Sequence, residues 1–467
     1  MGFCGRLSWP RPCSSWPSGF AKGRSILAGG CTRSGRFATL LAPILETIVQ
    51  KVDLIIHSAT QLCIVPGADG PQRGLGLGDL GIVENGAVAV ADRVIVATGE
   101  TADIRSDYSA RTMIDAYGRC VIPGFVDPHT HIPWYGDRAG EFESRLAGAT
   151  YMEIMAEGGG IMSTVRDTRR ARLDELVEDN LPRLERMLRY GTTSAEAKTG
   201  YGLNTATELK LLDSIMALNA RQAIELSPTF LPAHAVPQEY EGRTEAYVDL
   251  VIQDMLPAAA EWVAEYGVPI FCDVFCEEGV FDLDQTRRIL QTAASLGFRL
   301  KVHADEFVGL GGTRLAVQLG AVSADHLVET PQEDIEALGQ GSTVAVGLPG
   351  TPFGLAHEKY TPAKAILRAG GALALATDCN PGTSWCESMQ MVIALACRYM
   401  GLTQAQALVA ATLNAAHAIG RGREIGSLEN GKQADILILD TVDYRQLGYR
   451  YGTNLVNKVI KRGQIIE

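Results

Sequence analysis

The sequence predicts an α/β protein, a (β/α)8 TIM-like barrel with a small β-sandwich domain built from both chain ends. Three observations support this fold class. Amphipathic helical segments alternate with short β-branched strands through the middle of the chain, which is typical of a parallel sheet. Polar clusters directly follow these strands, where such a barrel carries its active site. Further β-branched segments, set apart by glycines, occur near both ends of the chain.

Both ends of the chain contain segments that favour antiparallel strands. Residues 52–66 and 85–99 are rich in β-branched residues and are separated by a glycine-rich stretch. Ala434–Leu439 and Leu455–Ile460 have the same character near the C-terminus. We therefore expect the two ends to build one β domain together. The expected domains are residues 51–120 and 423–467 for the β-sandwich and residues 121–422 for the barrel.

The middle of the chain repeats a helix, a glycine and a strand. Apolar residues fall at helical spacing over 173–188, Gly191 is the expected stop, and Thr192–Ala197 is a short strand. An open doubly wound sheet would also place ligands at strand ends and is the alternative fold, but the chain has no Gly-rich dinucleotide-binding motif. The further repeats are helix 283–296 with strand 299–302, helix 312–319 with strand 321–324, and helix 362–369 with strand 372–377.

Composition excludes several classes of partner. The 467 residues carry a formal net charge of −12 without a large basic block, so nucleic acid is not an expected partner. Apolar stretches fall short of the roughly 20 residues that a membrane-spanning helix needs, so we expect no membrane. The ten cysteines have no Cys-x-x-Cys spacing, which favours small buried thiols in a reducing compartment. These observations predict a cytoplasmic enzyme that acts on a small-molecule substrate.

Residues 1–50 differ from the rest and form an expected N-terminal extension. The first 45 residues hold six basic residues and no acidic one. An Arg- and Ser-rich, acid-poor start is a feature of organelle transit peptides, but a disordered tail or a mis-assigned start explains it equally well. We therefore keep the cytoplasmic prediction.

Two histidines directly follow a predicted strand and share one face of it. His129 and His131 come after the apolar run Val121–Val126, and the two-residue period of a strand points both imidazoles the same way. Imidazole suits zinc or iron, although two structural histidines are the ordinary explanation of such a pair. The chain has only eight histidines, and three others also occur in polar clusters at predicted strand ends, which favours a metal site. These three are His234, His303 and His326.

Carboxylates at two of these strand ends add candidate ligands and proton carriers. Asp378 follows an apolar strand and is a candidate ligand or proton acceptor, with a turn or helix cap as the alternative. Glu306, three residues after His303, is a candidate general acid or base, with a solvated loop carboxylate as the alternative. Asp305 and Glu306 together are candidates to orient the imidazole of His303.

Two further residues are candidates for substrate contact. Arg138 follows the His129/His131 pair by one loop and would bind a substrate carboxylate through two parallel hydrogen bonds, with a surface salt bridge as the alternative. Tyr201 either closes the pocket or covers the core. The Cys272, Cys276 and Cys379 thiols have no histidine at a persuasive spacing, so we do not expect thiol catalysis.

Several motifs together resemble a known family. Val121–Arg138 (VIPGFVDPHTHIPWYGDR) is similar to the first barrel strand of the amidohydrolase superfamily, and within it the sequence resembles the imidazolonepropionase family most closely. The resemblance covers roughly residues 52 to 467. The motifs that carry it, in chain order, are Glu141-Phe-Glu, Gly158-Gly-Gly-Ile, Lys198-Thr-Gly-Tyr-Gly-Leu, His303-Ala-Asp-Glu, Ser323-Ala-Asp-His-Leu, Thr377-Asp-Cys-Asn-Pro-Gly-Thr and Gly426-Ser-Leu-Glu-x-Gly-Lys-x-Ala-Asp.

The resemblance implies roles for individual residues. It implies one Zn²⁺ or Fe³⁺ ion per chain, because Lys198, which bridges two metals in many amidohydrolases, is not a ligand in this family. It also implies a catalytic set, Glu306, His326 and Asp378, and a homodimer. The implied metal ligands are His129, His131, His303 and Asp378. The implied substrate-binding residues are Arg138, Tyr201, His234, Glu306, Asn380, Gly382 and Thr383, with Tyr151 as a further candidate.

The implied reaction is hydrolysis of the ring C–N bond of 4-imidazolone-5-propanoate to N-formimidoyl-L-glutamate, the third step of L-histidine degradation. Metal-bound hydroxide is the expected nucleophile. Asp378 and His326 would orient the water and take its proton, and Glu306 would pass a proton to the leaving ring nitrogen. Arg138 would fix the propanoate carboxylate.

Two other functions are open. The first is a different cyclic-amide hydrolase or a cytosine-deaminase-like enzyme on the same barrel; the combination of Arg138, Tyr201 and Asn380 favours instead a ring with an anionic tail. The second is a barrel without catalysis that serves as a binding protein. That function predicts eroded ligands, whereas all four implied ligands are present in the sequence.

Overall fold

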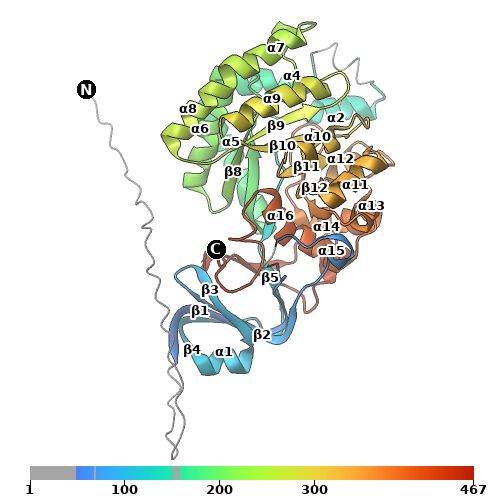
Figure 1. The fold of residues 1–467 in the computed structure, drawn as a ribbon. Helices are drawn as coiled ribbons and strands as arrows, with labels where there is room; N and C mark the ends of the chain where they lie inside the picture. The colour runs from blue at the N-terminus through green and yellow to red at the C-terminus, as the bar shows by residue number, and fades with distance from the viewer. Residues whose placement is uncertain (1–48, 68–69, 150–152, 154–157, 467) are drawn as a thin grey trace, which may run out of the picture. The chain divides into compact units, whose positions relative to one another are not determined.

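A computed structural model of the protein describes residues 49–67, 70–149, 153 and 158–466. The expectations for the N-terminal extension and for Tyr151 fall outside these residues. The described chain contains an eight-stranded parallel sheet surrounded by helices, and a second eight-stranded sheet built from both ends of the described chain (Figure 1). The predicted fold class, a barrel with a β domain from the two chain ends, is confirmed.

The barrel strands follow one another in chain order. Each strand pairs in parallel with the next from β6 to β13, as expected when every crossover is a helix. The strands are β6 (Phe125–Asp127), β7 (Thr192–Lys198), β8 (Glu225–Ala233), β9 (Phe271–Cys276), β10 (Arg299–Ala304), β11 (Ser323–His326), β12 (Val344–Gly347) and β13 (Ala372–Leu375).

Most strands of this sheet follow a helix whose start or end is marked by a capping residue or a glycine. The helix over Leu173–Arg189, for example, begins where the side chain of Glu175 accepts a hydrogen bond from the backbone N–H of Arg172 at 2.8 Å. Gly191 follows it with φ of 99°, and a Cβ atom there would lie 2.8 Å from Leu437, so only glycine fits. The helices are α1 (Thr101–Asp107), α2 (Ala139–Leu146), α4 (Ile161–Arg170), α5 (Leu173–Arg189), α6 (Thr205–Arg221), α7 (Thr244–Leu250), α8 (Leu256–Tyr266), α9 (Leu283–Ser295), α10 (Gly312–Gln318), α11 (Gln332–Gln340), α12 (Gly350–Gly354), α13 (Ala363–Arg368), α14 (Met389–Leu395), α15 (Gln404–Ala410), α16 (Leu413–Ala418) and α17 (Gln446–Tyr449).

The barrel closes between β6 and β13 just beyond the ends of these strands. The backbone N–H of Asp378 donates to the carbonyl of His129, and that of His131 donates to the carbonyl of Cys379, both at 3.0 Å. Lower in the seam, the buried carboxylate of Asp127 accepts hydrogen bonds from the backbone N–H and the hydroxyl of Thr377. The seam therefore brings residues 129–131 and 378–379 side by side.

The predicted apolar run Val121–Val126 is divided between the two sheets. Cys120–Pro123 (β5) pairs with strands of the end sheet, whereas Phe125–Asp127 belongs to the barrel. Gly124 lies between the two, and a Cβ atom there would lie 2.3 Å from the hydroxyl of Thr193. The other strands of this sheet are β1 (Gln50–Cys63), β2 (Ile82–Ala91), β3 (Val94–Glu100), β4 (Tyr108–Asp115), β14 (Ile436–Leu439), β15 (Val456–Lys461) and β16 (Gln464–Ile466).

A buried lysine links the end sheet to the barrel. The Nζ atom of Lys461 on β15 lies 2.7 Å from carboxylate oxygens of both Asp435 and Glu225, and Glu225 begins barrel strand β8. Arg421 and Arg462 also pair with Glu225. The predicted boundaries of the two domains stay predictions, since this contact shows how the domains join and not where each ends.

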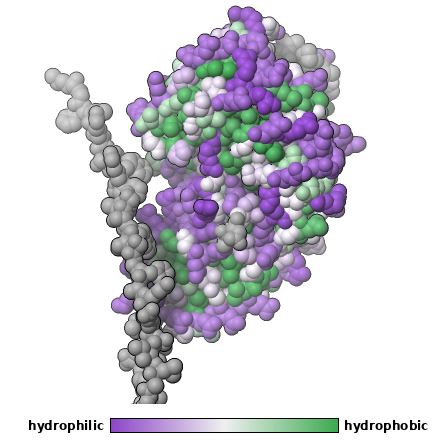
Figure 2. Space-filling view, viewed as in Figure 1, coloured by the Kyte–Doolittle hydropathy of each residue, from purple (hydrophilic) through white to green (hydrophobic). Residues whose placement is uncertain are grey.

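Hydrophilic residues are spread over the face of the molecule that Figure 2 shows, with smaller hydrophobic areas between them. Among the described residues, no helix combines the length and the apolar character that crossing a membrane requires. The described cysteines are free, and most of them are buried, as the sequence predicted.

We predict that Lys461→Met destabilises the protein by on the order of 3 kcal/mol, because it leaves the carboxylates of Asp435 and Glu225 without their shared buried cation. Thermal unfolding of the purified variant measures the effect. Lys458→Met is the matched control, since Lys458 lies on the same strand but is exposed. Equal unfolding midpoints for the two variants would contradict the prediction.

Candidate metal centre

Three imidazoles meet at the carboxyl ends of the barrel strands. His129 and His131 follow β6, and His303 lies on β10. The Nε2 atom of His131 is 3.3 Å from the Nε2 atoms of both His129 and His303. All three side chains are at most 4% exposed. Their Nε2 atoms therefore lie close together in the buried interior.

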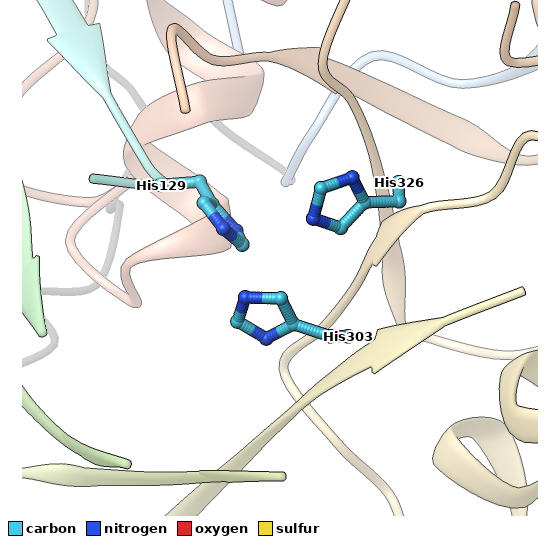
Figure 3. A group of neighbouring side chains, drawn as sticks. All are labelled: His129, His303 and His326. Atoms are coloured by element: carbon cyan, nitrogen blue, oxygen red, sulfur yellow. The ribbon is translucent and has the colours of Figure 1, made fainter. Parts of the chain in front are cut away.

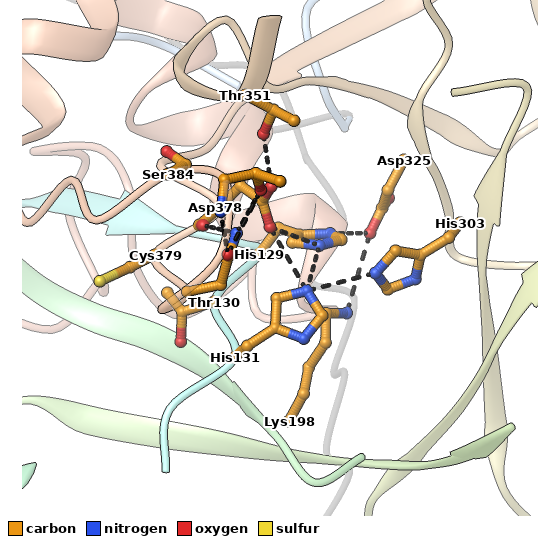
Figure 4. A network of polar contacts seen from close by, with 12 residues as sticks. His129, Thr130, His131, Lys198, His303, Asp325, Thr351, Asp378, Cys379 and Ser384 are labelled. Carbon is orange, nitrogen blue, oxygen red and sulfur yellow. Dashed lines mark hydrogen bonds and ion pairs between the residues drawn. The ribbon is translucent and has the colours of Figure 1, made fainter. Parts of the chain in front are cut away.

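Asp378 completes this cluster from the opposite side of the barrel seam. Its Oδ1 atom lies 3.4 Å from Nε2 of His129 and 3.3 Å from Nε2 of His131. Its other oxygen, Oδ2, accepts a hydrogen bond from the hydroxyl of Thr351 (Figure 4). The residue has φ of 53°, a left-handed conformation that aspartate seldom adopts outside turns and functional sites. Oδ1 is thus directed at the imidazoles while Oδ2 is held.

The spacing of these four atoms fits a metal ion. Ligand atoms that lie about 2.0–2.1 Å from a tetrahedral zinc are about 3.3–3.4 Å from one another. The four separations given above are 3.3 or 3.4 Å. The buried Oδ1 atom of Asp378 has no hydrogen-bond donor among the described residues, which is the situation a cation would relieve. The donor set, three imidazoles and one carboxylate, suits zinc or iron.

His326 stands beside the cluster. Its ring centroid is 5.3 Å from those of both His129 and His303, and ligand atoms of these three histidines lie within 4.8 Å of one another (Figure 3). His326 has φ of 79°, and the Nδ1 atom of its ring is 3.6 Å from a carboxylate oxygen of Glu306. The structure therefore places His326 next to the His129/His303 rings and Glu306 behind it.

Two buried aspartates contact the far sides of the histidine rings. Asp325 on β11 lies 2.7 Å from Nδ1 of His129, and Asp273 on β9 lies 2.9 Å from Nδ1 of His303. A carboxylate at Nδ1 fixes the proton there and leaves Nε2 free to bind a metal. The expectation that Asp305 orients His303 is wrong. The carboxylate of Asp305 instead accepts hydrogen bonds from the first turn of α10, because the chain turns away after β10.

Two buried lysines hold these aspartates from below. Lys198 Nζ lies 2.7 Å from Asp273 and 2.8 Å from Glu196. Lys301 Nζ lies 3.0 Å from Glu196 and 3.5 Å from Asp325. All five side chains are fully buried, and two ammonium groups against three carboxylates leave one net negative charge beneath the histidines.

This layer contains a second group of potential ligands. Atoms of His129, Glu196 and Asp325 lie within 4.8 Å of one another. The ammonium groups of Lys198 and Lys301 already neutralise these carboxylates at this position. Lysines therefore occupy the surroundings of this second group, and the mononuclear site that the resemblance implies stays a prediction.

Burial and these ion pairs determine the charge of the layer. Burial opposes ionisation of Asp325 and Asp273, but Lys301 beside Asp325, and the His303 imidazole with Lys198 beside Asp273, hold both pKa values below the usual range. Burial would lower the pKa of Lys198, yet the three carboxylates around it raise that pKa. Lys198, Asp273 and Asp325 are consequently ionised at neutral pH.

Burial also keeps most of the histidines neutral. It lowers the pKa of His131 to about 4 and lowers the pKa values of His303, His234 and His326. Burial and Lys198 both lower the pKa of His129, but its contacts with Asp325 and Asp378 raise that pKa overall. Neutral imidazole is the form that binds a metal.

Tyr201 and His234 form one wall of the site. The ring of His234, just after β8, stacks on that of His131 with centroids 4.8 Å apart. Tyr201 is 4% exposed, and its ring centroid is 5.3 Å from that of His234 and 6.1 Å from that of His131. Burial raises the pKa of Tyr201, so its hydroxyl keeps its proton as a hydrogen-bond donor. Of the two expectations for Tyr201, the structure places it at the site.

The remaining predicted substrate residues gather on the loop after β13. The side-chain oxygen of Asn380 accepts from the backbone N–H groups of Gly382 and Thr383, both at 2.8 Å, and its amide nitrogen donates to the carbonyl of Asp378. Arg138 packs against this loop, and both border a cavity of about 380 Å³. The other cavity-lining residues are Asp137, Ala139, Phe142, Arg145, Gly354, Pro381 and Trp385.

Sequence reasoning missed Asp273, Glu196 and Lys301 and gave Lys198 no role. The signal that marks them is a charged residue at a two-residue interval inside an apolar strand. Lys301 precedes His303 by two residues on β10, and Glu196 precedes Lys198 by two on β7, so each pair points to the same side of its strand.

A parallel barrel with a buried cluster of three histidines and an aspartate at its strand ends defines a hydrolase of the amidohydrolase class. Known proteins agree with this class, as the sequence profile of the amidohydrolase family matches residues 120–466. Among solved structures, an adenosine deaminase from Xanthomonas campestris with bound zinc has a TM-score of 0.66 at 22% identity, covering 89% of this chain and 93% of its own. Escherichia coli guanine deaminase has a TM-score of 0.65 at 16% identity, covering 88% and 98%. These two structures share the fold.

Curated relatives are more specific. An imidazolonepropionase of Herpetosiphon aurantiacus is 53% identical over 86% of this chain and 95% of its own length. That of Chloroflexus aggregans is 51% identical over 90% of this chain and 99% of its own. The chain belongs to the imidazolonepropionase family of amidohydrolases and is an enzyme, as its motifs predicted.

We predict that Asp325→Asn weakens binding of a divalent metal by about 10- to 100-fold, because the proton on Nδ1 of His129 loses its carboxylate partner. Competition with a chromophoric chelator measures the affinity. Asp334→Asn is the matched control, since Asp334 is equally buried but pairs with Arg314 on the outer helices. An unchanged metal affinity in Asp325→Asn would refute the orienting role of this carboxylate.

Proposed function

We propose that this enzyme hydrolyses the ring C–N bond of 4-imidazolone-5-propanoate, giving N-formimidoyl-L-glutamate in histidine degradation, with one zinc or iron ion per chain. The observation that carries the proposal is the convergence of His129, His131, His303 and Asp378 on one point. Relatives that are 51–53% identical over nearly their whole length and named imidazolonepropionase support the choice of substrate.

The four ligand side chains would hold the ion. When bound, such an ion lowers the pKa of a water molecule and polarises the ring carbonyl. Overall, the hydroxyl part of water joins the ring carbonyl carbon, the bond from this carbon to the ring nitrogen breaks, and that nitrogen takes a proton. The protein must therefore accept one proton from water and deliver one to the leaving nitrogen.

Asp378 and His326 are placed to handle the proton of water. Burial would raise the pKa of Asp378, but the neighbouring imidazoles of His129 and His131 hold it well below the usual range, so this carboxylate is an acceptor. Burial keeps His326 neutral, and its ring faces the histidine cluster. A neutral imidazole there would donate a hydrogen bond to the developing oxyanion.

Glu306 is placed to deliver the second proton. Its side chain is 9% exposed, and burial, with Asp378 and Glu277 adding to it, raises its pKa well above the usual value. A carboxyl group in this environment keeps its proton toward neutral pH and is suited to act as a general acid. The 3.6 Å separation from Nδ1 of His326 connects the two proton carriers.

The rest of the predicted set would hold the substrate. Tyr201 and His234 form an aromatic wall beside His131, where a planar ring fits. Arg138 lies at the cavity beside Gly382 and Thr383, in reach of an anionic tail. A deaminase on the same barrel would need no such arginine, so the cavity favours the propanoate-bearing ring. The cytoplasmic location, which rests on the composition and the cysteine usage, and the homodimer, which rests on the family resemblance, belong to this proposal.

Incubation of the purified enzyme with fresh 4-imidazolone-5-propanoate tests the function. We expect the ultraviolet absorbance of the ring to disappear with metal-loaded enzyme and to persist after treatment with a chelator. Metal analysis is expected to give one zinc or iron per chain. Persistence of the absorbance with the metal-loaded enzyme would refute the substrate, and activity without metal would refute the metal dependence.

We predict that Glu306→Gln lowers kcat by about 10²–10⁴-fold, because glutamine cannot donate the carboxyl proton. The raised pKa of Glu306 has a second consequence. In the wild type the protonated form is lost as pH rises through that pKa, so kcat falls on the alkaline side; the variant is expected to lack this decline. A pH series of kcat measures both effects. Undiminished turnover of Glu306→Gln would rule out the assigned role.

A further inference from the structure

We propose that Glu141 is a positioning residue for substrate binding. It holds the guanidinium of Arg138 so that one free edge faces the cavity beside Gly382, where the carboxylate tail of the substrate binds. The inference rests on the proposed function and adds to it a residue that does not touch the substrate itself. Three sets of contacts carry it.

The first set joins Glu141 to one edge of the guanidinium. Arg138 immediately precedes α2, and its Nε and Nη2 atoms both donate to Oε2 of Glu141, at 2.9 and 2.7 Å. Both side chains are only 17% exposed. A guanidinium has five N–H donors, so this contact uses one edge and leaves the donors of Nη1 for another partner. Within the described residues, Nη1 has no hydrogen bond.

The second set aims that free nitrogen at the cavity. A Cβ atom on Gly382 would lie 2.4 Å from Nη1, so the guanidinium packs against bare backbone that no other residue would provide. Gly382 and Thr383 line the same cavity of about 380 Å³ as Arg138. Arg145 lines it as well, with Nη2 3.4 Å from the carbonyl of Gly382. Both arginines thus stand where an anionic group would enter.

The third set prevents Glu141 from moving with the arginine. Its second oxygen, Oε1, accepts from the backbone N–H of Gly160 at 3.1 Å and from the hydroxyl of Ser163 at 2.9 Å. Gly160 precedes helix α4 and has φ of 73°, where a side chain would be strained. Glu141 therefore bridges Arg138 to the start of another helix. The bridge joins the sequence motif that begins at Glu141 to the one at residues 158–161.

Charge keeps the bridge in place. Partial burial favours the neutral form of Glu141, but the hydrogen bonds from Arg138 and Ser163 lower its pKa overall, so it is ionised at neutral pH. Asp137 also lines the cavity, but its Oδ1 atom accepts from the backbone of Ala139. The formal charges of Asp137 and Glu141 offset those of Arg138 and Arg145 at this cavity. A substrate carboxylate would meet oriented donors rather than a mobile excess of positive charge.

Loss of the bridge is expected to affect binding and not chemistry. Without Glu141, the Arg138 side chain gains rotamers that substrate binding must remove, which weakens affinity. The reacting ring lies at the histidine cluster and keeps its contacts. Interactions that are equally strong in the ground and transition states change KM and leave kcat unaltered.

The test compares Glu141→Gln with the wild type on 4-imidazolone-5-propanoate and on its neutral propanamide analogue. We expect KM for the anionic substrate to rise about tenfold, with kcat within twofold, and KM for the neutral analogue to stay the same. Glu245→Gln is the matched control, since Glu245 pairs with Arg288 at 2.7 Å on the exposed outer helices. Its KM values should equal those of the wild type.

The other outcomes separate the two proposals. Wild-type enzyme that fails to consume the substrate would overturn the proposed function and with it the role of Glu141. Wild-type turnover with an unchanged KM in Glu141→Gln would overturn only the role of Glu141. An equal rise in KM for the anionic and the neutral substrates, or a fall in kcat alone, would assign Glu141 to the stability of the fold instead.

Discussion

The site depends on a buried arrangement of charge. Three carboxylates and two ammonium groups lie below the histidines with no exposure to solvent, and such groups are tolerated only when each is paired. Each carboxylate is shared between a lysine and a further partner. Asp325 and Asp273 contact the histidines, while Glu196 lies between the two lysines. The orientation of the His129 and His303 rings therefore depends on carboxylates whose positions the barrel strands fix.

The barrel explains why so many chemical groups reach one point. Residues on neighbouring parallel strands pair in register, so a side chain on one strand lies at the same level of the barrel as its partner on the next strand. Side chains two residues further along lie on the next level. On β10, Lys301 belongs to a lower level and His303 to an upper level, and Asp325 on β11 pairs in register with His303. The loop that carries Asn380, Gly382 and Thr383 begins only beyond the upper level, which separates the proposed chemistry from the proposed recognition of the anionic tail.

The sequence predicted the repeating helices and strands because helical spacing and glycine stops are local signals, as for α5 with Gly191. It did not single out β9 or β12, since short buried strands lack an alternating pattern. The ligand histidines were recognisable from their place after strands. The partner of His303 was not, because Asp273 is a neighbour across the sheet, whereas Asp305 is a neighbour along the chain. Contacts between strands depend on register, which no single segment encodes.

The barrel seam has a thermodynamic consequence. The hydrogen bonds that close the barrel between His129 and Asp378, and between His131 and Cys379, involve the residues that would hold the ion. Opening the seam separates the ligands, and an ion that binds only the closed form favours closure by mass action. Metal occupancy and the integrity of the barrel are then linked quantities. The concentration of free metal in the cell would help to set how often this enzyme opens along one particular line.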